Sequence, residues 1–338
     1  MTTPDRFVHV VFGATGAIGT AVVAELMRRG ERVRAVSRRG QALQGAEAVA
    51  ADAADPAQAA AAAAGAAFVY HCASPPYTRW PELFPPLTRS ILAAAESSGA
   101  KLVFADNLYA YGPVSGPLRE DLPAAARGPK GRTRVAMAAE ILDAHRQGRV
   151  RAVIGRASDY YGPHGTGSTA GETVFGRILA GKKPQWTGRL DQPHTFHYLP
   201  DIARGLLVLA DHPQADGQVW HLPAAEPLTA QQFFDLVAEA AGRPTPVKAS
   251  IASPALLAAA AGDAGDHLPI PCAVCHRCHQ VRNDTGPPRY NTAPDRRARN
   301  SQLVPLPLTD YRQDRTGPGT PTIPSQMYVR LFGSLFRC

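Results

Sequence analysis

A glycine-rich segment at residues 13–19, which reads GATGAIG, constrains the fold of this chain more than any other feature. It lies between an apolar stretch at 7–12 and an amphipathic stretch at 18–29, so a strand, a tight turn and a helix are predicted. Gly13 permits the turn, Gly16 lets the backbone approach a pyrophosphate, and Gly19 lets the helix pack against the sheet. Because N–H groups at a helix N-terminus bind phosphate, the segment predicts a dinucleotide site that also includes Thr15, Ala17 and Ile18.

Short apolar stretches alternate with helical stretches through the first half of the chain. We expect strands at 7–12, 32–37, 48–51, 67–72, 101–105 and 150–156. We expect helices at 18–29, in the alanine-rich run at 57–67, at 86–98 and at 134–147. Apolar strands separated by helices form a parallel sheet covered on both faces, so the order predicts a doubly wound parallel α/β sheet of the Rossmann type.

The second half of the chain has longer loops, richer in Gly, Pro and aromatic residues. Helices are expected at 202–211 and 229–241, with a short strand at 219–222 between them. Segments 157–195 and 224–262 are expected to form a small substrate-capping portion of a single domain spanning 1–265. Residues 266–338 hold ten Pro but only three Ala, which predicts an irregular tail, either disordered or translated out of frame.

The formal net charge of +8 is unevenly distributed. The tail holds ten Arg and five Asp without Lys or Glu, and so carries most of the excess charge. Nucleic-acid-binding chains show clustered Lys and Arg in a recognisable module, so no nucleic-acid partner is expected. No membrane span and no signal peptide are recognisable, and a cytoplasmic location is therefore expected.

The end of the second predicted strand bears on the choice of cofactor. An acidic residue there bonds the ribose hydroxyls of NAD, but this chain has Ser37-Arg38-Arg39. Guanidinium groups can bind the 2′-phosphate of NADP, so NADP is favoured over NAD, which stays an alternative. The other interpretation is that these arginines are solvated surface residues.

The spacing G-x-x-G-x-x-G and several later motifs resemble the extended and atypical short-chain dehydrogenase/reductase superfamily, in particular its NAD-dependent epimerase/dehydratase group, over about residues 7–245. The later matches, in chain order, are Asp52-Ala53, His71-Cys72-Ala73-Ser74, Tyr111-Gly112-Pro113, Tyr161-Gly162-Pro163 and the segment from Phe196 to Asp201. The resemblance implies that Asp52 and Ala53 lie by the adenine and that Cys72, Ala73 and Ser74 lie beside the cofactor.

The usual proton relay of that superfamily is missing from this chain. A Ser or Thr, a Tyr and a Lys four residues later normally serve, the Lys lowering the pKa of the Tyr. Aligned on the motifs, these positions fall on Asn107, Arg132 and Ala136. Arg132 cannot act as a general acid near pH 7, because the pKa of arginine exceeds about 12.

Other groups must then serve if the site is catalytic. Asp106 and Tyr109 follow the fifth predicted strand, Asp159 and Tyr160 follow the sixth, and ligands of such sheets bind at these strand ends. Arg132 and Lys130 are expected to hold an anionic substrate group. Structural roles are the alternative for each of these residues; they are favoured for Tyr111, His194 and His197.

A cysteine cluster at residues 272–279, CAVCHRCH, allows three interpretations. C-x-x-C spacing suits zinc, and C-x-x-C-H suits covalent haem attachment. Haem attachment requires export, and a closed zinc site usually draws on a second ligand pair. We therefore expect no metal site, and interpret the cluster as incidental to the tail.

These features together predict an NAD(P)-dependent oxidoreductase or epimerase/dehydratase that acts on a small molecule, either a sugar nucleotide or a carbonyl metabolite. The alternative is a non-catalytic NADP-binding sensor or regulatory protein, since the Tyr–Lys pair is absent. A truncated, marginally folded product is a third interpretation, raised by the tail. The oligomeric state stays open, a homodimer included.

Overall fold

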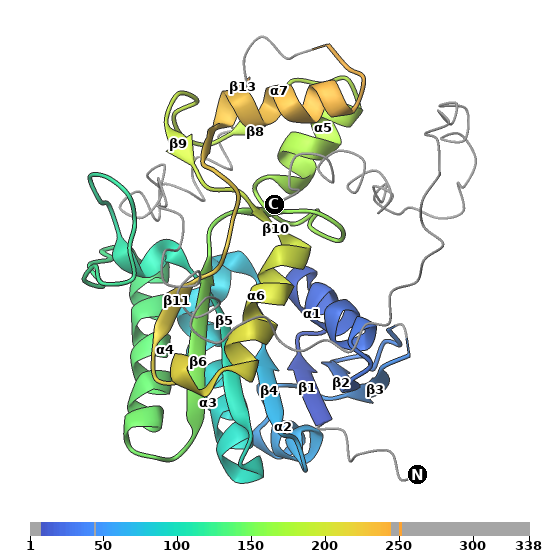
Figure 1. Cartoon of the computed structure of the whole chain (residues 1–338), viewed down its shortest axis with the longest axis vertical. Coiled ribbons are helices and arrows are strands. Elements are labelled where there is room, and N and C mark those ends of the chain that lie inside the picture. Colours follow the sequence, from blue (N-terminus) through green and yellow to red (C-terminus); the bar gives the residue numbers. More distant parts are fainter. Residues whose placement is uncertain (1–7, 44, 245–249, 252–338) are drawn as a thin grey trace, which may run out of the picture.

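A seven-stranded parallel sheet forms the centre of the computed structural model, which describes residues 8–43, 45–244 and 250–251 (Figure 1). The strands are β1 (Val8–Phe12), β2 (Arg32–Ser37), β3 (Glu47–Ala50), β4 (Phe68–His71), β5 (Lys101–Asn107), β6 (Arg151–Ala157) and β11 (Val219–His221). Their order in the sheet is β11-β6-β5-β4-β1-β2-β3, and every neighbouring pair is parallel. The predicted doubly wound Rossmann sheet is thereby confirmed.

Helices cover both faces of this sheet. The longer helices are α1 (Ala17–Arg28), α2 (Pro56–Ala63), α3 (Trp80–Ser98), α4 (Pro129–Arg146) and α6 (Leu199–Asp211). One apolar layer joins the sheet to α2, α3 and α4, and the other joins it to α1 and α6. The strand order reverses beside β1, which lies between β4 and β2. In open sheets of this kind, the crevice at the carboxyl ends of the strands next to such a reversal is where ligands bind.

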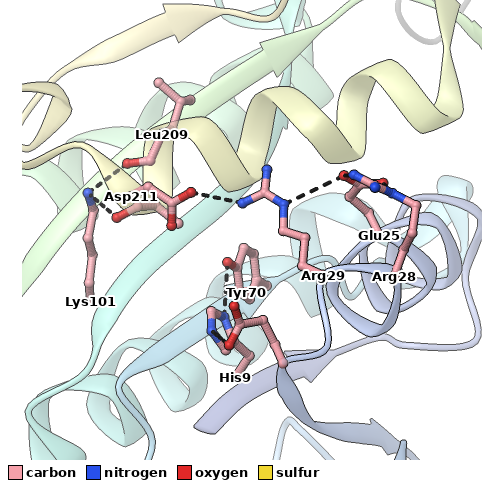
Figure 2. Close-up of polar contacts among 10 residues, drawn as sticks. His9, Glu25, Arg28, Arg29, Tyr70, Lys101, Leu209 and Asp211 are labelled. Carbon is pink, nitrogen blue, oxygen red and sulfur yellow. Dashed lines mark hydrogen bonds and ion pairs between the residues drawn. The ribbon is translucent and has the colours of Figure 1, made fainter. Parts of the chain in front are cut away.

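Buried and half-buried charges tie the α1–α6 layer to the sheet (Figure 2). Lys101 of β5 donates to the carbonyl oxygen of Leu209 at 2.6 Å and pairs with Asp216 at 2.5 Å. Burial lowers the pKa of Lys101, and its bond to Asp216 opposes that change. Arg29, just after α1, binds Asp211 at the end of α6 at 2.8 Å. These contacts fix α6 across the sheet, and α6 leads from the capping region to β11.

Smaller elements gather at one end of the molecule (Figure 1). They are η3 (Gly171–Gly176), α5 (Arg177–Leu179), β8 (Gln185–Trp186), β9 (Pro193–His194), β12 (Leu228–Thr229), α7 (Ala230–Ala240) and β13 (Ser250–Ile251). Residues of η3, α5, β8, β12 and α7 share an apolar cluster of their own, in which the rings of Phe196 and Phe233 stack at 3.9 Å. These elements come from the described parts of the segments expected to cap the substrate, 157–195 and 224–262, and that role stays a prediction.

Two helices begin five or more residues earlier than the sequence predicts. Helix α3 begins at Trp80 instead of 86, and α4 begins at Pro129 instead of 134. Each has a proline in its first turn, where proline costs no hydrogen bond because the N–H would be unpaired anyway. Helix α3 also continues through Pro85 and Pro86, although the sequence predicts that the helix begins only at 86.

The predicted tail at 266–338, and the cysteine cluster within it, lie outside the described residues. None of the helices in the described ranges is both long enough and apolar enough to cross a membrane.

Candidate active site

A cavity of about 1050 Å³ runs along the carboxyl ends of β1, β2, β4, β5 and β6 toward the capping elements. It is lined at one end by the glycine-rich turn and at the other by Trp186 and His194. The residues predicted to bind the cofactor line it as a group: Gly13, Thr15, Gly16, Ala17, Ile18, Ser37, Arg38, Asp52, Ala53, Cys72, Ala73 and Ser74. The structure thus brings together segments that are up to 61 residues apart in the sequence.

The glycine-rich turn is shaped for a close approach of backbone atoms. Gly13 has φ +77°, and a Cβ placed there would lie 2.5 Å from the backbone nitrogen of Ala73. A Cβ on Gly19 would overlap the carbonyl of Gly13, so Gly19 sets the packing of the helix and does not line the cavity. Gly16 is the N-cap of α1 and supplies no side-chain cap. The first N–H groups of α1 are therefore left for an anion, and the residues present fit the pyrophosphate of a dinucleotide.

The ends of β2 and β3 bear the groups predicted to meet the adenosine. Ser37 and the exposed Arg38 line the cavity, whereas Arg39 does not. Asp52 accepts a hydrogen bond from the N–H of Ala54, which holds the loop after β3 in place. The Cys72 thiol is buried, which raises its pKa to about 12, so it stays protonated at neutral pH.

Asp106 lies at the centre of a buried ion cluster. Its carboxylate is fully buried and accepts from Arg156 at 2.9 Å and from Arg134 at 3.3 Å. The Arg134 guanidinium lies 4.3 Å from the ring centroid of Trp80 and 4.2 Å from that of Phe84. Asp106 lines the cavity, and both of its oxygens are taken up by arginines.

Helix α4 places different residues toward the cavity than the sequence predicts. Arg132 and Ala136 are exposed, Arg132 bonds the carbonyl of Arg127, and neither lines the cavity. Arg134 does line it, and the buried Lys130 lies 3.9 Å over the ring of Tyr77, which also lines it. Residues four apart share a helix face, whereas residue 132 points away from both. The role of Arg132 therefore stays a prediction that the cavity lining does not support, whereas Arg134 of this helix lines the cavity and Lys130 contacts a residue of its wall.

Two tyrosines predicted for the site lie in the cavity wall. The hydroxyl of Tyr109 is 3.3 Å from that of Tyr77. Burial, followed by the charge of Asp159, raises the pKa of both Tyr109 and Tyr160. Both phenols therefore stay protonated near neutral pH and can donate hydrogen bonds.

Asp159 lies against a histidine that the sequence interpretation assigned a structural role. His194 Nε2 is 3.0 Å from Asp159 Oδ2, and both residues line the cavity. His197 lies behind them and bonds the carbonyl of Leu222 at 3.0 Å, and Tyr111 bonds His221 at 2.7 Å; neither His197 nor Tyr111 lines the cavity.

The sequence interpretation missed Arg134 and the aromatic residues Tyr77 and Trp80, and it favoured a structural role for His194. The four-residue spacing of Lys130 and Arg134 was a readable signal for α4. His194 had no such signal, because it meets Asp159 only through the packing of the capping elements. Among the described residues, no group of three or more His, Cys, Asp or Glu side chains could hold a metal ion.

The fold is shared with solved structures at low sequence identity. A UDP-glucose 4-epimerase from Thermus thermophilus, solved with NAD, is 20% identical with a TM-score of 0.64, covering 82% of this chain and 93% of that chain. A UDP-N-acetylglucosamine 4-epimerase from Methanobrevibacter ruminantium, solved with UDP-N-acetylmuramic acid, is 17% identical with a TM-score of 0.69, covering 83% and 93%. A dTDP-glucose 4,6-dehydratase from Streptomyces venezuelae is 17% identical with a TM-score of 0.66, covering 81% and 89%.

The sequence comparisons give the family itself. No curated protein sequence matches the chain significantly. The model of the NAD dependent epimerase/dehydratase family matches residues 9–222, which span the glycine-rich turn, the whole parallel sheet and most of the cavity wall. The chain therefore belongs to the NAD dependent epimerase/dehydratase family.

Proposed function

We propose that this protein is an NADP-dependent oxidoreductase or epimerase/dehydratase that acts on a small molecule, either a sugar nucleotide or a carbonyl metabolite. The observation that carries the proposal is the single cavity that extends from the glycine-rich turn past Tyr109 to Trp186 and His194. A dinucleotide lying along the strand ends would reach from the glycine-rich turn to Tyr109. The end of the cavity beside Trp186 and His194 would then be left for a substrate.

The preference for NADP rests on the end of β2. Arg38 lines the cavity one residue after the strand, where an acidic residue would serve NAD. A guanidinium there pairs with a phosphate in a charge-assisted hydrogen bond, which a ribose hydroxyl cannot equal.

The capping end of the cavity is polar enough for a sugar. Its wall includes Thr166, Ser168, Gln185 and Thr187, with the indole of Trp186 among them. Hydroxyl and amide groups beside an aromatic ring suit a ligand with many hydroxyls. The three solved relatives named above are enzymes of nucleotide-linked sugars, which makes nucleotide sugars the first substrates to test.

The side chains around the expected reacting centre have separable tasks. The bound cofactor would accept or supply hydride. Arg134 stays charged near neutral pH and would stabilise negative charge on a ligand oxygen. Tyr109 would donate a hydrogen bond to the substrate, and Asp159 would accept one from a substrate hydroxyl, from water or from a neighbouring side chain.

Turnover tests the proposal. Purified full-length protein is mixed with NADPH or NADP+ and a panel that includes UDP-glucose, UDP-N-acetylglucosamine, dTDP-glucose and simple carbonyl compounds. We expect a substrate-dependent change in NADPH absorbance or an epimerised product, reduced at least 100-fold in Tyr109→Phe and Asp159→Asn but unchanged in Arg132→Gln. Tight binding of both cofactor forms without turnover would favour the sensor, and the absence of binding would reject the proposal.

A further inference from the structure

Two tyrosine hydroxyls meet in the cavity wall, close to the strand ends. Tyr77 lies in η1 (Tyr77–Arg79), after β4, and Tyr109 lies in η2 (Leu108–Tyr111), after β5. Their oxygens are 3.3 Å apart, the hydrogen bond between them is exposed, and both residues line the cavity. Tyr77 is 37% exposed, whereas Tyr109 is half-buried. The pair thus joins an exposed phenol to a more enclosed one.

Neighbouring side chains fix the two phenols relative to each other. The Trp80 ring meets the Tyr77 ring edge-on at 4.9 Å between centroids and lies 5.9 Å from the Tyr109 ring. The side chain of Asn107 accepts a hydrogen bond from the N–H of Tyr109 at 3.1 Å and so caps η2. Both hydroxyls therefore have defined positions, which is what proton transfer between two side chains requires.

A cation lies over the exposed phenol. Lys130, in the first turn of α4, is buried, and its Nζ is 3.9 Å from the centroid of the Tyr77 ring. An ammonium group is attracted to the face of such a ring, and more strongly where water is excluded. The same positive charge stabilises the negative charge that forms when a proton leaves the hydroxyl. Lys130 thus offers Tyr77 the electrostatic support that a lysine gives the usual tyrosine of the superfamily.

Tyr109 acting alone would be a costly proton donor. Burial raises its pKa, and the charge of Asp159 raises it further. Loss of its proton would leave a phenolate that both effects disfavour, unless another proton replaces it at once. Because a phenol both donates and accepts hydrogen bonds, the Tyr77 hydroxyl can supply that proton while Tyr109 gives its own away.

Other polar groups of the cavity wall are engaged elsewhere. Both oxygens of Asp106 are taken up by arginines, and Oδ2 of Asp159 faces His194 at 3.0 Å. The Cys72 thiol stays protonated at neutral pH, because burial raises its pKa to about 12. The hydroxyl of Tyr77, exposed and hydrogen-bonded to that of Tyr109, is better placed than these groups to return a proton.

We propose that Tyr77 passes a proton to Tyr109 as Tyr109 donates its own to the substrate oxygen, and that Lys130 stabilises the charge that forms on Tyr77. This inference rests on the proposed function. In carbonyl reduction, hydride from the nicotinamide dinucleotide adds to the carbonyl carbon. The O–H bond of Tyr109 breaks as that of the product forms, and the O–H bond of Tyr77 breaks as Tyr109 regains a proton. Solvent then returns a proton to the exposed Tyr77, and alcohol oxidation runs the same steps in reverse.

The first test removes the Tyr77 hydroxyl from the full-length protein and measures turnover with NADP+ and UDP-glucose, then with the rest of the panel above. Tyr77→Phe keeps the ring, so we expect kcat to fall at least about tenfold while KM and cofactor affinity stay within about threefold. Tyr198→Phe removes a hydroxyl outside the cavity wall and should keep the wild-type rate. A kcat for Tyr77→Phe within about threefold of wild type would overturn the inference and leave the proposed function intact.

Two further comparisons separate a relay from a packing role. If the two hydroxyls act in one relay, Tyr77→Phe combined with Tyr109→Phe should be no slower than Tyr109→Phe alone. Lys130→Met should lower kcat at least about tenfold, and Lys130→Arg, which keeps the charge, should recover most of that loss. Lys182→Met is the control, at an exposed lysine outside the cavity wall. Additive losses in the double variant, or equal losses in both Lys130 variants, would contradict the relay.

A structural measurement keeps the inference falsifiable if no member of the panel reacts. In crystals of the NADP+-saturated protein, the Tyr109 hydroxyl should lie within about 5 Å of the nicotinamide carbon that exchanges hydride, which leaves room for one substrate oxygen between them. The hydrogen bond between Tyr109 and Tyr77 should persist. Failure of NADP+ to bind would reject the proposed function. A bound nicotinamide farther away, or a Tyr77 turned from Tyr109, would reject the relay alone.

Discussion

The two ends of the cavity follow different rules. At the cofactor end, from Gly13 to Ser74, almost every residue that the motif predicts lines the cavity, because glycine backbones and helix N–H groups form the surface there. At the catalytic end, from Asp106 to His194, the expected Tyr and Lys are absent, one predicted residue points away, and an unpredicted histidine faces the cavity. Backbone geometry therefore ties the first end to the family pattern, whereas single side chains can change the second end.

The largest effect should come from the catalytic end. Asp106→Asn leaves two buried guanidinium groups without a counter-charge, and we expect a loss of about 3–5 kcal/mol in the free energy of unfolding, measured in urea. Asp191→Asn, which breaks the exposed pair with Arg189, should leave the midpoint unchanged. Similar midpoints for both variants would show that the ion cluster does not hold this end together.

The cofactor end should be most sensitive at Gly13. Gly13→Ala would press a methyl group into the backbone of Ala73, and we expect NADPH affinity to fall at least about 100-fold, or about 3 kcal/mol, by calorimetry. Gly65→Ala is the matched control, since Gly65 also has a positive φ but nothing within 4 Å of its Cβ. The Gly65→Ala variant should lose about 1 kcal/mol in the free energy of unfolding and keep its affinity for NADPH. Equal affinities in the two variants would contradict the close approach.

Acid should destabilise both ends together. Burial lowers the pKa of His71, near the cofactor end, to about 3 and that of His197, near the capping end, to about 4, so each is neutral when folded. The unfolded chain takes up protons below about pH 6.5, and the stability from each neutral ring is present above that pH and lost as the pH falls toward 4. From pH 7 to 5 each should cost about 2 kcal/mol, and His71→Gln or His197→Gln should make the decline shallower by that amount. Curves parallel to wild type would contradict this.

The smallest effect concerns the choice of cofactor. Arg38→Gln should weaken NADPH binding about tenfold while leaving NADH binding within twofold, because a hydrogen bond between charged groups contributes about 1.5 kcal/mol or more. Arg39→Gln provides the control, since Arg39 is also exposed but does not line the cavity. An equal loss for both cofactors would place the 2′-phosphate elsewhere.

The sequence predicted the sheet and its strand boundaries well, because these depend on local periodicity. The residues predicted for the cofactor end line one cavity, because they follow glycines at fixed spacing and the ends of neighbouring strands. It misplaced the starts of α3 and α4, where prolines in the first turn looked like breaks. Arg132 is exposed because it lies two residues from both Lys130 and Arg134 on α4, and side chains two residues apart do not share a helix face. The contact of His194 with Asp159 could not be predicted, because it joins residues 35 positions apart through tertiary packing.

A crystal structure with NADPH bound tests most directly the claim that a standard cofactor site serves an altered catalytic end. We predict the pyrophosphate at the N–H groups after Gly13, the 2′-phosphate at Arg38, and the nicotinamide ring between Tyr109 and the Asp159–His194 pair. A nicotinamide beside Arg132, or a dinucleotide that avoids the glycine-rich turn, would contradict the account.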